Sequence, residues 1–215
     1  MKLLLTLIIA LFAFILVSCG EKAKEMKDAL ELAQKAPEMA KNMQSAQDAS
    51  KVRWEERKKK GDTLSLPFKK LEEFIPPTIS GYKSEEPAGQ NMNMQGLSYS
   101  ESSRRYVKEN ATGAAEDIEI KLVDYNATQD LFSAAFFWMS TNFSREDANG
   151  YERTIDIGVK EVPGFEKYTK SSKTAELTFA VGYRFILTIR VENQANTDFA
   201  KSIAKSMRLA DLAKM

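Results

Sequence analysis

The segment Ser102-Ser103-Arg104-Arg105-Tyr106 is the polar cluster with the clearest capacity for chemistry in this 215-residue chain. Guanidinium groups beside hydroxyls can bind a carboxylate or a phosphate through paired, charge-assisted hydrogen bonds. Arg104, Arg105 and Tyr106 are therefore candidate ligand-binding residues. Solvated strands often carry the same residue types, so a plain surface strand is the alternative interpretation.

Acidic residues are the other candidates, because two carboxylates facing each other in a cleft can hydrolyse a glycosidic bond. Asp117 and Glu119 alternate onto the polar face of one expected strand, and Asp124 follows them. A solvated sheet face has the same pattern. A carboxylate-based hydrolase is therefore only a second alternative, and we expect no catalytic residue and no enzyme.

Two arginines near the end of the chain fall outside the apolar phase of their expected strand. We expect Arg184 and Arg190 to pair with Glu176 or Glu192.

Composition excludes several classes of site. The chain has one cysteine and no histidine, which rules out an internal disulfide, a thiolate zinc cluster and any catalytic pair that uses histidine as the base. No Walker motif, GxSxG elbow or EF-hand loop is present, so we expect neither a metal nor a cofactor. The formal net charge is +1, and with no strongly basic domain we expect no nucleic-acid partner.

The first eighteen residues have the pattern of a secretory signal. Lys2 supplies a positive start, and Leu3–Val17 is an apolar run broken only by Thr6. That run is shorter than the about 20 residues of a membrane-spanning helix and suits the apolar core of a signal peptide.

The run ends in Leu16-Val17-Ser18-Cys19, which resembles the bacterial lipobox. The resemblance implies a diacylglyceryl group on the Cys19 thiol and cleavage between Ser18 and Cys19. An acyl chain on the new amino group often follows. Two or three lipid chains anchor a protein stably where one does not. The membrane is thus one expected partner, and Gly20 resembles an address for the outer membrane, on its periplasmic face or at the surface, more than for the inner membrane.

Residues 19–60 form the second expected region, a lipid-anchored helical stalk. Good helix formers fill Glu21–Ala36, and opposite charges lie four residues apart. Pro37 is expected to interrupt the helix and could begin a second one. Forty helical residues would span about 60 Å. Arg57-Lys58-Lys59-Lys60 then reads either as a contact with anionic lipid or, with more support, as cations at a helix end before Gly61.

Residues 61–215 are expected to form a single α+β domain. Its antiparallel sheet should have about six or seven strands, packed with two main helices over Thr128–Phe143 and from Asn196 or Thr197 to Met207. A short helix over Lys69–Phe74 should precede the sheet, and Pro87–Gly96 is expected to be a loop. The expected strands are Leu97–Val107, Glu116–Tyr125, Arg153–Val159, Phe165–Thr169, Thr174–Val181 and Tyr183–Val191. Gly182 suggests a tight hairpin between the last two.

This order of elements resembles the Mog1p/PsbP-like fold, including small lipoproteins of the DcrB and LpqN kind. The similar pieces are Leu71–Pro76 followed by Gly81-Tyr82, an aromatic central helix, Val162-Pro163-Gly164-Phe165 before Tyr168, and the hairpin at Gly182. The resemblance implies an accessory or binding protein, although fold alone does not determine function.

We therefore expect a membrane-anchored envelope lipoprotein that acts as a non-catalytic protein-binding or assembly module, with an envelope protein as its partner. An apolar or methionine-rich patch near Met92 and Met94 would be its signature. The alternative is a periplasmic receptor for a small ligand, which needs a pocket of about 300 Å³ or more.

Overall fold

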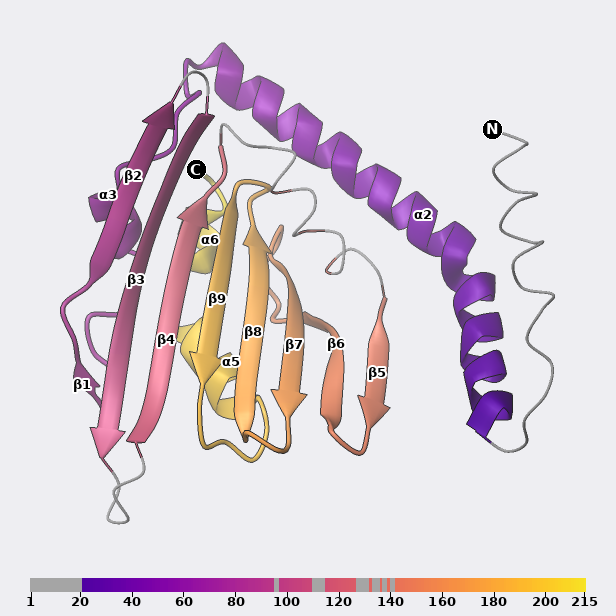
Figure 1. Ribbon diagram of the computed structural model, residues 1–215. Coiled ribbons are helices and arrows are strands. Elements are labelled where there is room, and N and C mark those ends of the chain that lie inside the picture. The colour runs from indigo at the N-terminus through magenta and orange to yellow at the C-terminus, as the bar shows by residue number, and fades with distance from the viewer. Residues whose placement is uncertain are drawn as a thin grey trace. The chain divides into compact units, whose positions relative to one another are not determined.

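Nine antiparallel strands form one sheet in the computed structural model, which describes residues 21–94, 97–109, 115–126, 132, 136, 139 and 142–215 (Figure 1). The strands are β1 Lys83–Ser84, β2 Ala88–Met94, β3 Leu97–Glu109, β4 Ala115–Asp124, β5 Ser144–Asp147, β6 Gly150–Asp156, β7 Pro163–Thr169, β8 Thr174–Val181 and β9 Phe185–Val191. They lie in the order β1-β3-β4-β9-β8-β7-β6-β5, and β2 also pairs with β3. The expected α+β class with an antiparallel sheet is confirmed.

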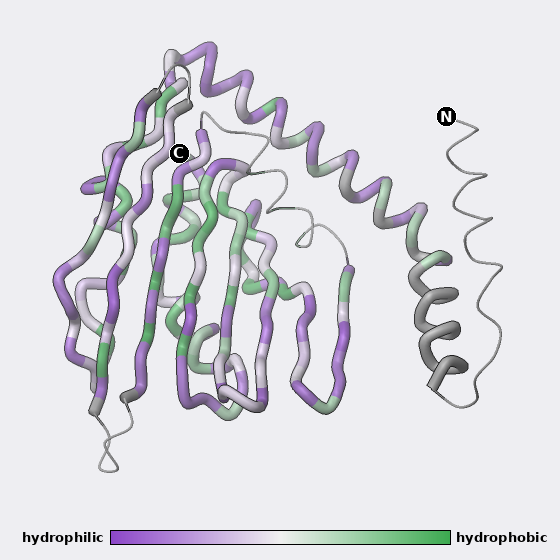
Figure 2. The backbone as a smooth tube through the Cα atoms, viewed as in Figure 1, coloured by the Kyte–Doolittle hydropathy of each residue, from purple (hydrophilic) through white to green (hydrophobic). Residues whose placement is uncertain are grey.

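Three short helices cover one face of this sheet: α3 Phe68–Glu72, α5 Asp198–Ser206 and α6 Leu209–Leu212 (Figure 1). The main core lies between them and the central strands, where hydrophobic residues concentrate (Figure 2). Ile118, Ile120 and Leu122 of β4 are fully buried there, as the alternation in the sequence predicts.

The predicted strand count of six or seven is too low, because β1, β2 and β5 were not foreseen. The interpretation of Pro87–Gly96 as a loop is wrong: Ala88–Met94 pairs residue for residue with β3. Residues 88–93 of β2 and all four residues of β5 are exposed, so neither strand needs the apolar alternation that marks a strand with one buried face. The pattern that sequence reading relies on is therefore missing from both.

The helix predicted from Asn196 or Thr197 to Met207 is confirmed as α5, and Thr197 is its N-cap residue, without a capping bond from its side chain. The Oδ1 of Asn196 accepts from the backbone N–H of Asp198 at 2.8 Å, whereas the hydroxyl of Thr197 bonds to Glu166. The predicted helix over Thr128–Phe143 lies largely outside the described residues. Of its described members, Phe132, Phe136 and Met139 are buried and pack with Ala180 and Ile186 on the sheet face opposite α5, whereas Asn142 and Phe143 at its predicted end are not helical.

The stalk region contains one helix, α2 Glu21–Lys59, which continues through Pro37 and is not interrupted by it. The chain forms two compact units, Met1–Ala40 and Lys41–Met215, so the second half of α2 belongs to the unit that contains the sheet. None of the helices in the described ranges is long and apolar enough to cross a membrane.

The end of α2 is a Schellman motif. The N–H of Asp62 bonds to Arg57 O at 2.9 Å, and that of Gly61 bonds to Lys58 O at 3.0 Å. Gly61 has φ 76°, a left-handed conformation that glycine adopts without steric cost. The motif turns the chain so that the Asp62 carboxylate follows directly on the last turn of the helix.

A row of alternating charges crosses the sheet face opposite α5. Seven residues on seven neighbouring strands stand directly opposite one another, each of opposite sign to the next. They are Arg105, Glu119, Arg190, Glu176, Lys167, Glu152 and Arg145. Directly opposed unlike charges stabilise a sheet by about 0.2–1 kcal/mol per pair. The net charge of the row is small. The row is therefore better suited to contact with water than to binding a highly charged polymer.

Glu166 on β7 fastens α5 to the sheet. Its side chain is fully buried and takes hydrogen bonds from Arg153 Nε at 2.5 Å, Lys201 Nζ at 3.0 Å and the Thr197 hydroxyl. Burial acts to raise the pKa of Glu166, but the hydrogen bonds from Thr197, Lys201 and Arg153 outweigh it and leave that pKa below its ordinary value. The ionised form is therefore the one that holds α5.

Because the ionised form of Glu166 makes these contacts, the folding stability of the protein should depend on pH. A depressed pKa contributes stability above the unfolded-state value of about 4.3, and that contribution is lost as the pH falls through the folded-state value. We predict that Glu166→Gln costs about 2–3 kcal/mol at neutral pH. Urea unfolding of both proteins should show this difference narrowing below about pH 4. A difference independent of pH would contradict the assignment, and Glu119→Gln on the exposed face is the matched control.

Candidate functional site

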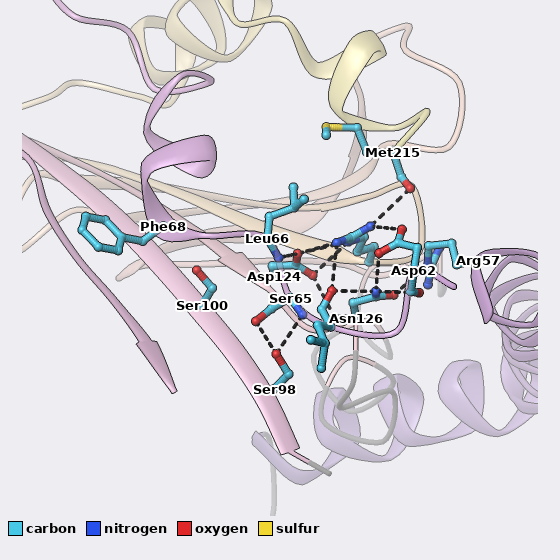
Figure 3. Close-up of polar contacts among 12 residues, drawn as sticks. Arg57, Asp62, Ser65, Leu66, Phe68, Ser98, Ser100, Asp124, Asn126 and Met215 are labelled. Atoms are coloured by element: carbon cyan, nitrogen blue, oxygen red, sulfur yellow. Dashed lines mark hydrogen bonds and ion pairs between the residues drawn. The ribbon is translucent and has the colours of Figure 1, made fainter. Parts of the chain in front are cut away.

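Arg184 lies at the centre of a largely buried polar network at one end of the sheet. We call it the Arg184 network, and its members are Arg57, Asp62, Asp124, Asn126 and Arg184. Figure 3 labels the first four of them. Asp124 ends β4 in the same phase as the buried Ile118, Ile120 and Leu122, so its carboxylate points to the core side and is fully buried. Arg184 follows Gly182 in the β8–β9 hairpin and is 1% exposed.

The two side chains bond to each other in a bidentate arrangement. Arg184 Nε lies 3.0 and 3.1 Å from the Asp124 oxygens, and Arg184 Nη2 lies 2.8 Å from Oδ2. The backbone N–H groups of Asn126 and Leu66 donate to the same carboxylate at 2.9 and 2.8 Å. Buried charges are tolerated only when they are paired and hydrogen-bonded in this way.

The remaining donors of Arg184 hold the segment that follows α2. Nη1 donates to Asp62 Oδ2 at 2.7 Å and to Met215 O at 3.4 Å, and Nη2 donates to Leu64 O at 3.4 Å. The pairing of Arg184 with Glu176 or Glu192 predicted from the sequence is wrong. Those two acids stand near Arg190, at the opposite end of the strands, and Arg190 does pair with Glu192.

Asn126 connects this ion pair to helix α2. Its Nδ2 donates to Asp62 O, Asp62 Oδ1 and Leu64 O at 3.0–3.1 Å. Its Oδ1 accepts from Arg57 Nε at 2.8 Å, and its backbone carbonyl accepts from Trp54 Nε1 at 3.1 Å. One fully buried side chain therefore bonds to both α2 and the segment that follows it.

Arg57 is buried, so it is not the surface cation that its place in the last turn of a helix suggested. It also donates to Tyr183 O at 3.3 Å. Burial, followed by repulsion from Arg184, lowers the pKa of Arg57 to about 10, and Asp62 and Asp124 partly compensate. One turn earlier, Arg53 donates to Ala213 O at 3.0 Å and pairs with Glu161 at 3.6 Å. Helix α2 is thus docked mainly by polar contacts.

A groove of about 550 Å³ lies beside this docked helix. Its apolar lining comes from Met139, Ile155, Val159, Val162, Pro163 and Tyr183, and its polar lining includes Asn42, Asp156, Lys160 and Glu161. The groove shares residues with the docking contacts, because Glu161 pairs with Arg53 and the carbonyl of Tyr183 accepts from Arg57. Any ligand there would touch the elements that hold α2.

The residues proposed for ligand binding from the sequence do not converge on one place. Arg104 and Tyr106 point to the helix-covered face, where both bond to Pro76 O and Arg104 also pairs with Glu72. Arg105 points to the opposite face and pairs with Asp117. Successive residues of a strand face opposite sides of the sheet, so this division follows from the strand itself. Ligand binding at these residues stays a prediction.

The carboxylates considered for hydrolysis are also separated. Asp117 and Glu119 lie on the solvated face, whereas Asp124 is committed to Arg184 on the other. Within the ranges that the structure describes, no group of three acidic or sulfur side chains is placed to hold a metal ion. Cys19, Ser18 and Leu16 lie outside the described residues.

No protein-family model matches this chain, and no curated protein or solved structure is significantly similar to it.

The network predicts that α2 can be loosened without unfolding the sheet. Removing the Arg57 contacts by Arg57→Leu should cost about 1.5–3 kcal/mol of docking free energy. Amide hydrogen exchange over residues 41–59 should then accelerate about tenfold or more, while exchange in β8 and β9 should change little. The exposed Lys51→Leu on the same helix is the control. Equal acceleration in the helix and the strands would contradict a local docking role.

Proposed function

We propose that this protein is a lipid-anchored lipoprotein of the bacterial envelope, attached through Cys19 and acting as a non-catalytic binding module. The observation that carries the proposal is the continuity of α2: the helix that begins two residues after Cys19 runs to Lys59, and its Arg57 is built into the Arg184 network. Within the unit Lys41–Met215, the last turns of α2 are held to the sheet by buried contacts, and this supports a role for the helix in presenting the domain near a membrane.

The lipid anchor itself has a direct chemical test. The mature wild-type protein should begin at Cys19 and carry the added mass of its acyl chains, measured by mass spectrometry of the N-terminal peptide. Cys19→Ala should lose that mass and remain uncut after Ser18, and Gly20→Ala should be processed normally. A wild-type chain that begins elsewhere, or that has a free thiol at position 19, would overturn the proposal.

The proposed partner is an envelope protein, although the expected signature of such a partner was a broad apolar patch. In the part of the chain that the structure describes, the exposed large hydrophobic side chains are Val52, Leu64, Met92 and Met215. Val52 lies on α2 and Met92 on β2, whereas Leu64 and Met215 lie outside the helices and strands. Protein binding is therefore better supported through polar contacts and sheet edges than through an apolar face.

A small-ligand receptor is the second candidate, and the groove favours it. Its volume of about 550 Å³ lies within the range of about 300–1,000 Å³ that is usual for ligand pockets, and its lining is divided equally between apolar and polar residues. The ligand that this lining suits has an apolar body and a polar end, because Met139, Val159 and Val162 line the same groove as Asn42 and Lys160.

Native mass spectrometry of protein purified from its own envelope tests this candidate. If the groove holds a ligand, the wild type should retain a non-covalent mass that Val159→Trp, which fills the groove, releases. Thr188→Trp on the open sheet face is a control of equal bulk and should retain it. A wild-type protein that carries no such mass would contradict the receptor hypothesis. The protein-binding module would then remain as the proposed function.

A further inference from the structure

Three consecutive lysines lie exposed where helix α2 ends: Lys58, Lys59 and Lys60. Within the ranges that the structure describes, their ammonium groups have neither a hydrogen bond nor an ion pair. The Nζ of Lys58 lies 4.8 Å from the centroid of the Trp54 ring, which holds that side chain against the helix. All three charges therefore face water.

The end of α2 does not need these lysines as caps. The carbonyl of Arg57 accepts from the backbone N–H groups of Lys60 and Asp62, and that of Lys58 accepts from the N–H of Gly61. The backbone therefore satisfies the last carbonyls of the helix by itself. Because an exposed cation gains little from the helix dipole once salt screens it, the other interpretation of this segment, a contact with anionic lipid, needs a test.

The acidic groups nearby are already paired. Asp62 Oδ2 accepts from Arg184 Nη1 at 2.7 Å, and Glu56 pairs with Arg53 at 3.5 Å. The Arg184 network as a whole has two carboxylates and two guanidinium groups, so it adds no net charge. Residues 51–62 contain six cationic and three acidic side chains. This end of the domain is therefore locally positive, although the chain as a whole is nearly neutral.

Leu64 adds an exposed apolar side chain to the same segment. Its carbonyl accepts from Asn126 Nδ2 at 3.0 Å and from Arg184 Nη2 at 3.4 Å, and the same Nδ2 donates to Asp62 O at 3.1 Å. These bonds fix the backbone of Leu64 beside the turn that follows Lys60. Its side chain nevertheless remains 62% exposed. The network thus holds an apolar side chain in water next to three free ammonium groups.

We propose that Lys58, Lys59, Lys60 and Leu64 form a contact surface for a bilayer with anionic headgroups, which we call the Lys58–Leu64 surface. The lysines would attract the lipid phosphates, and Leu64 would enter the boundary between headgroups and acyl chains. A soluble polyanion could use the lysines but has no apolar layer for Leu64, so the combination favours a bilayer. The surface belongs to the unit Lys41–Met215, and the proposal does not depend on the anchor at Cys19.

Vesicle binding tests this surface without the anchor. The chain from position 19, with Cys19→Ala, keeps every residue that the structure describes. It should be co-sedimented with vesicles of phosphatidylglycerol and phosphatidylcholine in equal parts, and with vesicles of phosphatidylcholine alone. Each lysine near an anionic surface strengthens binding about fivefold, so the three together should give a preference of about 100-fold for the anionic vesicles. Salt at about 0.5 M should remove most of that preference.

Two variants separate the charge from the apolar contact. Replacing the three lysines together, by Lys58→Gln, Lys59→Gln and Lys60→Gln, should remove the 100-fold preference. Leu64→Ser should weaken binding to anionic vesicles about tenfold and leave binding to soluble polyphosphate unchanged. The matched control removes the same charge from three other exposed positions: Lys83→Gln, Lys170→Gln and Lys205→Gln.

Three results would overturn the proposal. The first is a parent protein that binds both kinds of vesicle equally, and the second is a triple glutamine variant that binds like the parent or no worse than the control. The third is a Leu64→Ser variant that binds vesicles like the parent, because the surface would then recognise a charged polymer and not a bilayer. None of these results bears on the acylation of Cys19, which the mass of the N-terminal peptide tests separately.

Discussion

The bidentate contact between Arg184 and Asp124 is the interaction on which the arrangement of this domain depends. Both side chains are withdrawn from water, and removing one partner of such a pair typically costs about 3–5 kcal/mol because a buried charge is left behind. A well-packed apolar pair in the same place is often no less stable. The charged pair therefore affects the positions of neighbouring segments more than the net stability of the domain. Its remaining hydrogen-bond donors and acceptors bind those segments and fix where they lie.

Those spare groups join parts of the chain that are far apart in sequence. Arg184 reaches Asp62 and the end of the chain, Asp124 reaches the backbone of Leu66 and Asn126, and Asn126 reaches Arg57. The last turn of α2 is thus held by the same cluster that closes the β8–β9 hairpin. Tyr183 and Glu161 extend these contacts into the wall of the groove. The groove and the docked end of α2 therefore share two residues.

The central strands could be predicted from the sequence because they are buried on at least one face. Alternation placed β4, β8 and β9 within a residue or two of their observed bounds. The edge strands β2 and β5 carry no such alternation, because residues 88–93 and all four residues of β5 are exposed and their positions do not require apolar side chains. These two strands form because they pair with β3 and β6, and that long-range pairing cannot be predicted from their local residue pattern.

One feature of the sequence indicated the Arg184 network, but the rule that pairs opposite charges on neighbouring strands assigned Arg184 to the wrong partners. Asp124 continues the apolar phase of Ile118, Ile120 and Leu122, and a carboxylate in that phase must be buried with a partner. Arg184 looked like a strand residue, but β9 begins only at Phe185, so its side chain belongs to the hairpin. Arg57 was equally ambiguous, because a cation in the last turn of a helix is usually solvated. Which charges meet across 60 or more residues is a property of the fold.

A double-mutant cycle on Arg184 and Asp124 tests the central claim most directly, with the free energy of unfolding measured in urea. Arg184→Met and Asp124→Leu should each cost about 3–5 kcal/mol, and the double variant should cost less than the sum of the two. A coupling energy of about 2–3 kcal/mol is expected. Additive costs, with no coupling, would show that the two residues act independently and would contradict this account of the domain.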